Sequence, residues 1–261
     1  MKIVMLGAGN LATNLALALR KAGHEIVQVY SRTQASAEQL ARQTVSEATT
    51  RLNRLVQDAD LYVLSVKDDA MKPVLEAFPV QNGFLVHTAG SVDMEVLSDY
   101  SANYGVLYPL QTFSKERTVD FSHIPLCLEA NNQQNLEFLE HLASGLSSDI
   151  RHISSVQRAH IHVAAVFACN FSNFMLANAE AVLSHQQVSF DILAPLIRET
   201  IEKALQGSPA RAQTGPARRG DQQTMERHLN LLAHSPKLQN LYSFVSNAIA
   251  NDLASLKNSD E

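Results

Sequence analysis

The sequence has 261 residues, of which 46% are hydrophobic, and this length can bury a large core as one domain or as two smaller ones. Its net charge of −5 and its lack of basic blocks argue against nucleic acid as a partner. The apolar run at the N-terminus is cut short by glycines, no stretch is long enough to span a bilayer, and the ten histidines show no metal-ligand spacing. We therefore expect a metal-free cytoplasmic protein that binds no membrane.

The beginning of the sequence follows a strand, glycine turn, helix and strand pattern. Residues 2–6 form a short apolar strand, a helix runs to Ala22 and stops at Gly23, and residues 26–30 form the second strand. The turn has the form G-x-G-x-x-A, which binds dinucleotide phosphates in this context, and the partial positive charge of the helix N-terminus favours a pyrophosphate. We favour a dinucleotide site over a plain turn. The residues predicted to bind the dinucleotide in this turn are Gly7, Ala8, Gly9, Asn10, Leu11 and Ala12.

The residues after the second strand indicate which dinucleotide is bound. NAD-binding proteins place an acidic residue there to hold the ribose 2′-hydroxyl, and this sequence has Tyr30, Ser31, Arg32 and Thr33 instead. The Arg32 guanidinium can pair with a 2′-phosphate, and Ser31 and Thr33 can add hydroxyl donors. The alternative is that Arg32 stacks on adenine or caps the next helix. The pattern predicts NADP(H) as the cofactor, bound by Ser31, Arg32 and Thr33.

Helix and strand patterns alternate through the rest of the first half. Helices are expected near residues 33–44, 53–59, 68–78 and 133–146, and strands at 61–66, 83–88, 106–108, 125–129 and 150–153. This alternation predicts an α/β fold with a Rossmann-type doubly wound, mainly parallel sheet. Ligands bind beyond the carboxyl ends of such strands. The cofactor is therefore expected at Ser65, Val66, Lys67, Asp68 and Thr88, and the substrate at Gly90, Ser91, Gln111 and Thr112.

From residue 154 onward the pattern is helical. Ser154 and Gln157 have capping-box spacing, and the helical pattern then runs to about Ser184 without proline or glycine. Much of it is apolar or small on nearly every face, which predicts burial against other helices and a second subunit. Residues 190–205 and 222–256 also have helical patterns, with a break at 207–221. We predict an NADP-binding domain at 1–153 and an all-helical domain for substrate binding and dimerisation at 154–261.

Polar residues in the second half are candidates for the chemistry. His162 and Asn173 are eleven residues apart, about 20° around an α-helix, and Asn170 lies at the margin of the same stripe. His162 can protonate a carbonyl or imine as hydride arrives, or it can be a core histidine bonded across helices. We assign Asn170 to catalysis and Asn173 to the substrate; alternatively, both cap a loop of the partner. Arg219 either binds an acidic substrate group or contacts Asp221 in a helix connection.

Five motifs occur in a characteristic order, namely Gly7–Ala12, His87–Ser91, Pro109–Phe113, His162–Phe171 and Thr214–Asp221. In these motifs the chain resembles NADP oxidoreductases that join a Rossmann-like first half to an uncharacterised helical second half. These are distant relatives of pyrroline-5-carboxylate reductase, 6-phosphogluconate dehydrogenase and ketopantoate reductase. The resemblance implies a Rossmann domain, an all-helical domain resembling the C-terminal domains of 6-phosphogluconate dehydrogenases, and a homodimer formed through those helices.

The sequence departs from these relatives at two places. The hydroxyacid dehydrogenase branch has a catalytic lysine four residues before an asparagine of the long helix, where this chain has Val166 and Cys169. Members of the closer group often have histidine where this chain has Tyr108, and a tyrosine can still donate a proton. We predict an NADP(H)-dependent oxidoreductase that transfers hydride to or from a small anionic carbonyl, imine or hydroxy-acid substrate. The alternative is a non-catalytic NADP(H)-binding sensor or regulatory protein.

Overall fold

The computed structural model describes residues 1–79 and 83–257, with the side chains of 252–257 excepted. Two compact units divide the chain, Met1–Asn170 and Phe171–Glu261. The first unit holds a β-sheet and the first turns of the long helix, and the second consists of helices and their connections. The predicted domain boundary between residues 153 and 154 stays a prediction.

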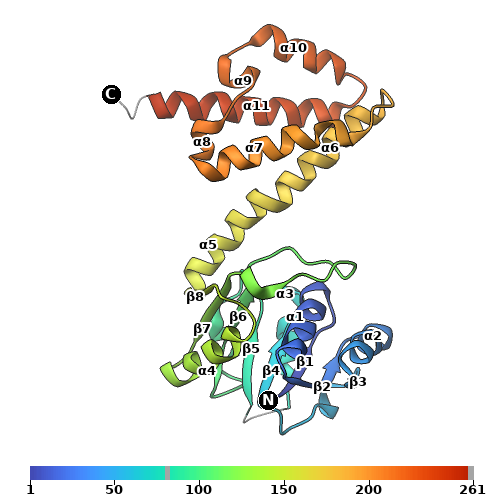
Figure 1. The fold of residues 1–261 in the computed structure, drawn as a ribbon, viewed down its shortest axis with the longest axis vertical. Coiled ribbons are helices and arrows are strands. Elements are labelled where there is room, and N and C mark those ends of the chain that lie inside the picture. Colours follow the sequence, from blue (N-terminus) through green and yellow to red (C-terminus); the bar gives the residue numbers. More distant parts are fainter. Residues whose placement is uncertain (80–82, 258–261) are drawn as a thin grey trace. The chain divides into compact units, whose positions relative to one another are not determined.

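One eight-stranded sheet forms the centre of the first unit (Figure 1). Its strands are β1 (Lys2–Leu6), β2 (Glu25–Tyr30), β3 (Glu47–Thr49), β4 (Leu61–Leu64), β5 (Phe84–His87), β6 (Tyr104–Pro109), β7 (Leu126–Ala130) and β8 (Ile150–His152). Their order is β3-β2-β1-β4-β5-β6-β7-β8, and neighbours are parallel except β6 and β7. The predicted doubly wound fold is thereby confirmed. The order reverses between β1 and β4, which is where open parallel sheets bind ligands.

Helices cover both faces of this sheet because its central strands are apolar on both faces. They are α1 (Asn10–Lys21), α2 (Gln34–Thr44), α3 (Asp68–Glu76) and α4 (Gln133–Ser144). Three connections between strands contain the 3-10 turns η1 (Leu52–Arg54), η2 (Met94–Leu97) and η3 (Phe121–His123). Along β1, Ile3 packs into one core with Leu15 of α1. Val4 belongs to a second core with Met71 of α3. This burial on both faces fixes the strand ends that carry the predicted site residues.

The segment before β4 differs from the expectation. The predicted short helix at 53–59 is replaced by the single turn η1. The buried Gln28 donates from Nε2 to the Arg54 carbonyl, and its Oε1 accepts from the Val56 N–H. The Tyr62 hydroxyl donates to the Val56 carbonyl and accepts from the Ala59 N–H. These side chains satisfy backbone groups that a helix would otherwise pair, so no helix forms.

The long helix begins at the predicted capping box, which is confirmed. Ser154 Oγ accepts from the Gln157 N–H at 3.3 Å, and Gln157 Oε1 accepts from the Ser154 N–H at 3.0 Å. Three segments follow, α5 (Ser155–Ala165), the π-helical η4 (Val166–Phe171) and α6 (Ser172–Ser184). The wider turn of η4 departs from the 3.6-residue period, so the spacing argument that put His162 and Asn173 on one face does not hold.

Residues 155–184 are long and apolar enough to cross a membrane, judged by length and composition alone. The expectation that no stretch has this property was therefore wrong. A single helix of this kind is weak evidence for a membrane span, because core helices of soluble proteins and signal sequences can be equally long and apolar. None of its apolar window is buried among the described residues, so the burial predicted for this helix stays a prediction.

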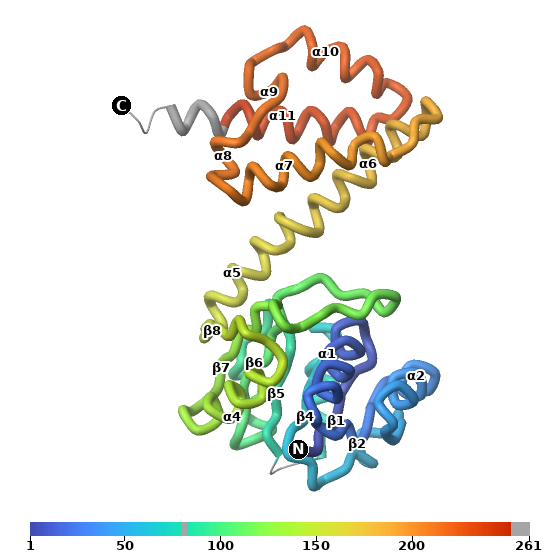
Figure 2. Tube along the Cα trace, in the orientation of Figure 1, coloured from blue at the N-terminus to red at the C-terminus, as the bar shows by residue number. Residues whose placement is uncertain are grey.

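The second unit continues with η5 (Phe190–Leu193), α7 (Ala194–Gln206), α8 (Pro209–Ala212), α9 (Pro216–Arg219), α10 (Gln222–Leu231) and α11 (Pro236–Lys257), traced in Figure 2. The predicted break thus contains two short helices. The predicted helix at 222–256 is two helices, because Pro236 cannot donate an N–H to a preceding turn and instead begins α11. Among the described residues of this unit, Ala217 is the one buried hydrophobic side chain, whereas Leu196 and Phe244 are exposed.

Candidate functional site

A cleft of about 820 Å³ lies at the carboxyl ends of the parallel strands in the first unit. It extends from the turn between β1 and α1 to β6 and α5. Gly90 and Gln111, from the predicted substrate set, and His162 contribute to its lining. Every residue predicted to bind the cofactor also lines it, namely Gly7, Ala8, Gly9, Asn10, Leu11, Ala12, Ser31, Arg32, Thr33, Ser65, Val66, Lys67, Asp68 and Thr88.

The turn between β1 and α1 leaves bare backbone in the cleft. Gly7 has a φ of +130°, its N–H donates to the Tyr30 carbonyl at 2.8 Å, and a Cβ there would overlap the Ser65 carbonyl. Gly9 has no atom within 4 Å of where a Cβ would lie, and it precedes α1, which has no side-chain cap. Unobstructed backbone beside free helix N–H groups suits a pyrophosphate, so these residues fit the predicted dinucleotide.

A basic side chain is available beyond the end of β2. The Ser31 N–H donates to the Thr49 carbonyl at 3.1 Å, which anchors this strand end to β3. Thr33 Oγ1 donates to Ser36 Oγ at 2.8 Å. Arg32 is exposed and lines the cleft, and its guanidinium makes no hydrogen bond or ion pair with residues 1–79 or 83–257. It is therefore available to bind a 2′-phosphate.

Asn14 anchors the loop after β6 to α1, and the sequence reasoning missed it. Its side chain is buried; Nδ2 donates to the Ser114 carbonyl at 2.9 Å, and Oδ1 accepts from the Val119 N–H at 3.2 Å. Asn10 adds a bond from Nδ2 to the Phe113 carbonyl at 3.1 Å. An asparagine on the apolar face of an amphipathic helix was the available signal, because a buried amide needs partners.

The other end of the cleft holds a tyrosine and a histidine in contact. The Tyr108 hydroxyl and His162 Nδ1 are 3.2 Å apart, and their rings meet edge to face. A Cβ at Gly90 would lie 2.5 Å from His162 Nδ1, so the backbone after β5 packs against the imidazole. Burial raises the pKa of Tyr108, so its hydroxyl stays protonated at neutral pH. The Tyr108–His162 pair can therefore deliver a proton into the cleft.

Five predicted site residues do not line this cleft. The Ser91 hydroxyl instead donates to Asp68 Oδ2 at 2.6 Å. Thr112 lines a neighbouring hollow. Asn170 is exposed on η4, and Asn173 and Arg219 are exposed in the second unit. Their catalytic and substrate-binding roles stay predictions.

The sequence suggested that Arg219 contacts Asp221, but in the structure the hydrogen bonds of Asp221 come from Thr224. The Asp221 carboxylate accepts from the N–H and the hydroxyl of Thr224, at 3.0 and 2.7 Å, and so caps α10. These bonds lower the pKa of Asp221, and the Arg219 charge adds to the effect. Arg219 thus influences Asp221 through its charge, while Thr224 provides the hydrogen bonds.

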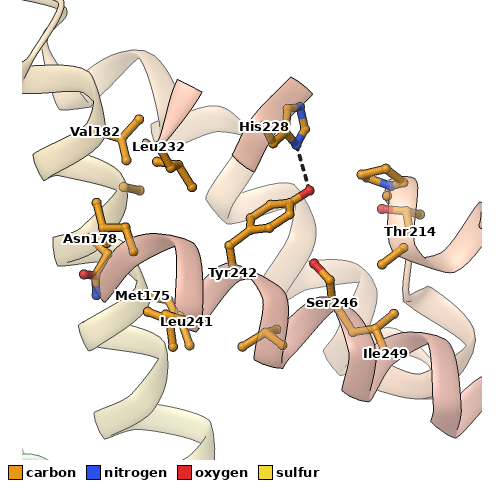
Figure 3. Close-up of a pocket in the computed structure, with 16 residues that line it drawn as sticks. Met175, Asn178, Val182, Thr214, His228, Leu232, Leu241, Tyr242, Ser246 and Ile249 are labelled. Atoms are coloured by element: carbon orange, nitrogen blue, oxygen red, sulfur yellow. Dashed lines mark hydrogen bonds between the residues drawn. The ribbon is translucent and has the colours of Figure 1, made fainter. Parts of the chain in front are cut away.

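The second unit has a cavity of its own, of about 360 Å³ (Figure 3). Apolar side chains from α6 and α11 line it, among them Met175 and Ile249, together with residues 214–217 and with Leu232, which follows α10. His228 Nδ1 and the Tyr242 hydroxyl, 2.8 Å apart, form a polar pair in its lining. The cavity is mainly apolar and does not include Arg219.

His87, at the end of β5, is a buried titratable group beside the cleft. Its side chain is fully buried, and Nδ1 accepts from the Ala89 N–H at 3.1 Å. Nε2 is buried without a hydrogen-bond partner among the described residues. Burial, and next the charge of Arg158, lower the pKa of His87 to about 4, so the imidazole is neutral at physiological pH.

This histidine makes the folded state sensitive to acid. Because its pKa is about 4 in the folded chain and 6.5 is the ordinary value for an exposed histidine, the unfolded chain takes up the proton first as the pH falls. The contribution of the neutral His87 to the free energy of unfolding is fully present above pH 6.5. It is lost as the pH falls from 6.5 to 4, which lowers the free energy of unfolding by on the order of 3 kcal/mol. The side chain of His87→Asn can still accept the Ala89 N–H but does not titrate. We therefore expect its free energy of unfolding, measured with urea, to change less with pH between 6.5 and 4 than that of the parent. Identical pH slopes for parent and variant would contradict the expectation.

Two family descriptions match the chain. Residues 2–89 match "NADP oxidoreductase coenzyme F420-dependent", and residues 124–249 match a domain of unknown function. A comparison with curated proteins gives no match.

Solved structures resemble the chain over nearly its full length. A "putative NADP oxidoreductase" from Bacteroides fragilis is 44% identical, with 96% of this chain and 98% of that chain covered and a TM-score of 0.89. An imine reductase from Myxococcus stipitatus in complex with NADP⁺ is 15% identical, with 99% and 95% covered and a TM-score of 0.68. A 1-pyrroline-5-carboxylate reductase from Streptococcus pyogenes is 13% identical, with 96% and 98% covered and a TM-score of 0.61.

Proposed function

Because this chain belongs to the NADP oxidoreductase family of the Bacteroides fragilis protein, we propose that it transfers hydride between NADP(H) and a small anionic carbonyl, imine or hydroxy-acid substrate. One observation carries the proposal. A single cleft joins the bare glycine backbone at one end to the Tyr108–His162 pair at the other. A binding module would need the first feature, whereas a reductase needs both.

The chain's own part in such a reduction is to supply a proton. NADPH, when bound, supplies the hydride that adds to the carbon of a C=N or C=O bond. The electron pair of that double bond moves to nitrogen or oxygen, which takes up a proton from the Tyr108–His162 pair. The 3.2 Å contact lets a protonated His162 ring replace the proton that the hydroxyl has given up, which leaves the imidazole neutral. In the oxidation direction the hydroxyl takes a proton from the substrate and a neutral imidazole accepts one from the hydroxyl. The relatives named for imine and pyrroline reduction motivate testing C=N substrates first.

Basic side chains support an anionic substrate. Lys67 and Lys115 line the cleft together with Arg32, whereas Asp68 is its one acidic residue among the described lining. If Arg32 binds the 2′-phosphate, the two lysines remain to attract a carboxylate. The Gln111 amide adds a neutral donor at the substrate end.

We also propose a cytoplasmic homodimer formed through the helical unit, with no nucleic acid or membrane partner. Large apolar side chains on its helices are exposed, including Phe174, Leu196, Ile201 and Phe244. Exposed apolar surface of this extent marks interaction sites, and a second copy offers the same surface in return. Sedimentation velocity at micromolar concentration is expected to give the mass of two chains. A monomer under these conditions would refute the dimer.

Cofactor choice provides a direct test of the proposal. Arg32→Ala is expected to weaken NADPH binding by roughly 10- to 100-fold and to leave NADH binding unchanged, because a charge-assisted bond contributes about 1.5–3 kcal/mol. Fluorescence titration of both nucleotides measures this. Arg42→Ala serves as the control, since Arg42 is an exposed arginine of α2 outside the cleft. Equal NADPH and NADH affinities in the parent would contradict the assignment.

A turnover screen tests the reaction itself. We expect NADPH oxidation with at least one imine or 2-oxo acid, or NADP⁺ reduction with a hydroxy acid. Tight NADPH binding without turnover across the panel would refute the enzyme and favour the sensor.

A further inference from the structure

Arg158 is a fully buried cation on α5, four residues before His162. Its Nη1 lies 2.5 Å from Glu129 Oε2 on β7, which balances the charge. Glu129 also accepts from the Ser155 N–H at 2.8 Å and from the Ser155 hydroxyl at 2.7 Å. A buried ion pair of this kind is weak evidence for stability by itself, so the other contacts of the guanidinium decide what it does.

Those contacts hold both ends of the loop after β5. Nε donates to the Ala89 carbonyl at 3.2 Å, and Nη2 donates to the Val92 carbonyl at 2.5 Å and to Ser155 Oγ at 3.0 Å. The planar guanidinium thereby fixes the two carbonyls that flank Gly90 and Ser91. A lysine ammonium is a point charge on a flexible stem and does not reproduce this fork.

The same loop contacts the imidazole of His162. Residues four apart on a helix face the same side, so Arg158 and His162 both face the loop. The space that a Cβ at Gly90 would need is occupied by His162 Nδ1 and Cγ. A shift of the loop therefore moves the surface against which the imidazole packs, and with it the 3.2 Å contact to Tyr108.

We propose that Arg158 is a positioning residue, which holds the loop Ala89–Val92 and α5 together so that His162 Nδ1 meets the Tyr108 hydroxyl. The proposal rests on the proposed function where it concerns turnover, and on geometry alone where it concerns His162. Arg158 itself does not line the cleft, so it acts through the pair.

The test uses NMR of the [¹⁵N]histidine-labelled full chain without cofactor, with the His162 signals assigned by their loss in His162→Gln. In Arg158→Lys we expect the His162 nitrogen shifts to move to the values seen in Tyr108→Phe. Ser155→Ala, which removes one hydroxyl from the network, is the milder second variant and is expected to move them in the same direction. The control is Arg151→Lys, which alters an exposed arginine–carboxylate pair on β8.

Turnover adds an independent readout. Arg158→Lys is expected to lower kcat by on the order of 10- to 100-fold with NADPH affinity unchanged, as misplacement of a reacting group does. Parent-like His162 shifts in Arg158→Lys and in Ser155→Ala would overturn the proposal, even if both variants were less stable. If Arg158→Lys does not fold, the Ser155→Ala spectrum decides. If the His162 shifts change in Arg158→Lys while the parent shows no turnover, the proposed function is refuted and the positioning role stands.

Discussion

Gly7→Ala is expected to abolish NADPH binding and to lower the free energy of unfolding by about 2–5 kcal/mol. Gly7 has a φ of +130°, which side-chain-bearing residues rarely adopt, and its Cβ would overlap the Ser65 carbonyl at the end of β4. The backbone must move to relieve that overlap, because the atom in the way belongs to the main chain and not to a flexible side chain. Urea denaturation and NADPH fluorescence titration measure the two effects.

Gly9→Ala is the matched control for this prediction. Its Cβ would meet no atom within 4 Å, and its φ of −78° is ordinary, so the fold should lose less than about 1 kcal/mol. NADPH affinity should nevertheless fall, because the methyl group would occupy the open space in which we propose that the pyrophosphate binds. Parent-like stability of Gly7→Ala would show that the turn is more plastic than the structure indicates. A strongly destabilised Gly9→Ala would contradict the role given to that glycine.

The second large effect concerns the Tyr108–His162 pair. Tyr108→Phe and His162→Gln are each expected to lower kcat by roughly 10²- to 10⁴-fold, the usual contribution of a positioned acid, with NADPH affinity unchanged. The double variant is expected to be little worse than either single variant, because two groups that relay one proton act as a unit. Single-turnover NADPH oxidation measures the chemical step directly.

Tyr104→Phe is the control for the tyrosine. Tyr104 belongs to the same strand, but its hydroxyl donates to Glu95 at 2.9 Å and lies outside the cleft. It should retain parent-like kcat. Independent, multiplicative losses in Tyr108→Phe and His162→Gln would argue against a relay. Full activity in either single variant would remove that residue from the mechanism.

The sequence predicted the parallel sheet, and it identified residues that lie together at one end of the cleft, because both depend on local signals. Apolar runs and the spacing of Gly7, Gly9 and Ala12 identify strand, turn and helix within one short segment. The family resemblance is likewise confirmed, since it rested on several ordered motifs. Short elements were harder: β3 has three residues and carries no periodic pattern.

The parts that could not be predicted depend on contacts between distant residues. In the sequence, Arg158 is one polar residue among several on a predicted helix. Its bonds to Ala89, Val92 and Glu129 become apparent only in the structure. The contact between Tyr108 and His162 joins residues 54 apart. The π-helical turn of η4 also carries no sequence signal of its own, and it removes the constant period on which face assignments depend.

The place of β1 in the middle of the sheet has a consequence for synthesis. One edge of β1 pairs with β2, but on the other edge Ile3 pairs with Leu61, 58 residues later, so that edge must wait for this much chain to emerge, roughly 3–12 s at 5–20 residues per second. Until Ser65 follows, the carbonyl that confines Gly7 does not exist. The turn proposed to bind phosphate is therefore among the first segments to be translated, whereas the carbonyl that confines it follows only after β4. A nascent chain arrested before residue 61 should consequently show no affinity for NADPH.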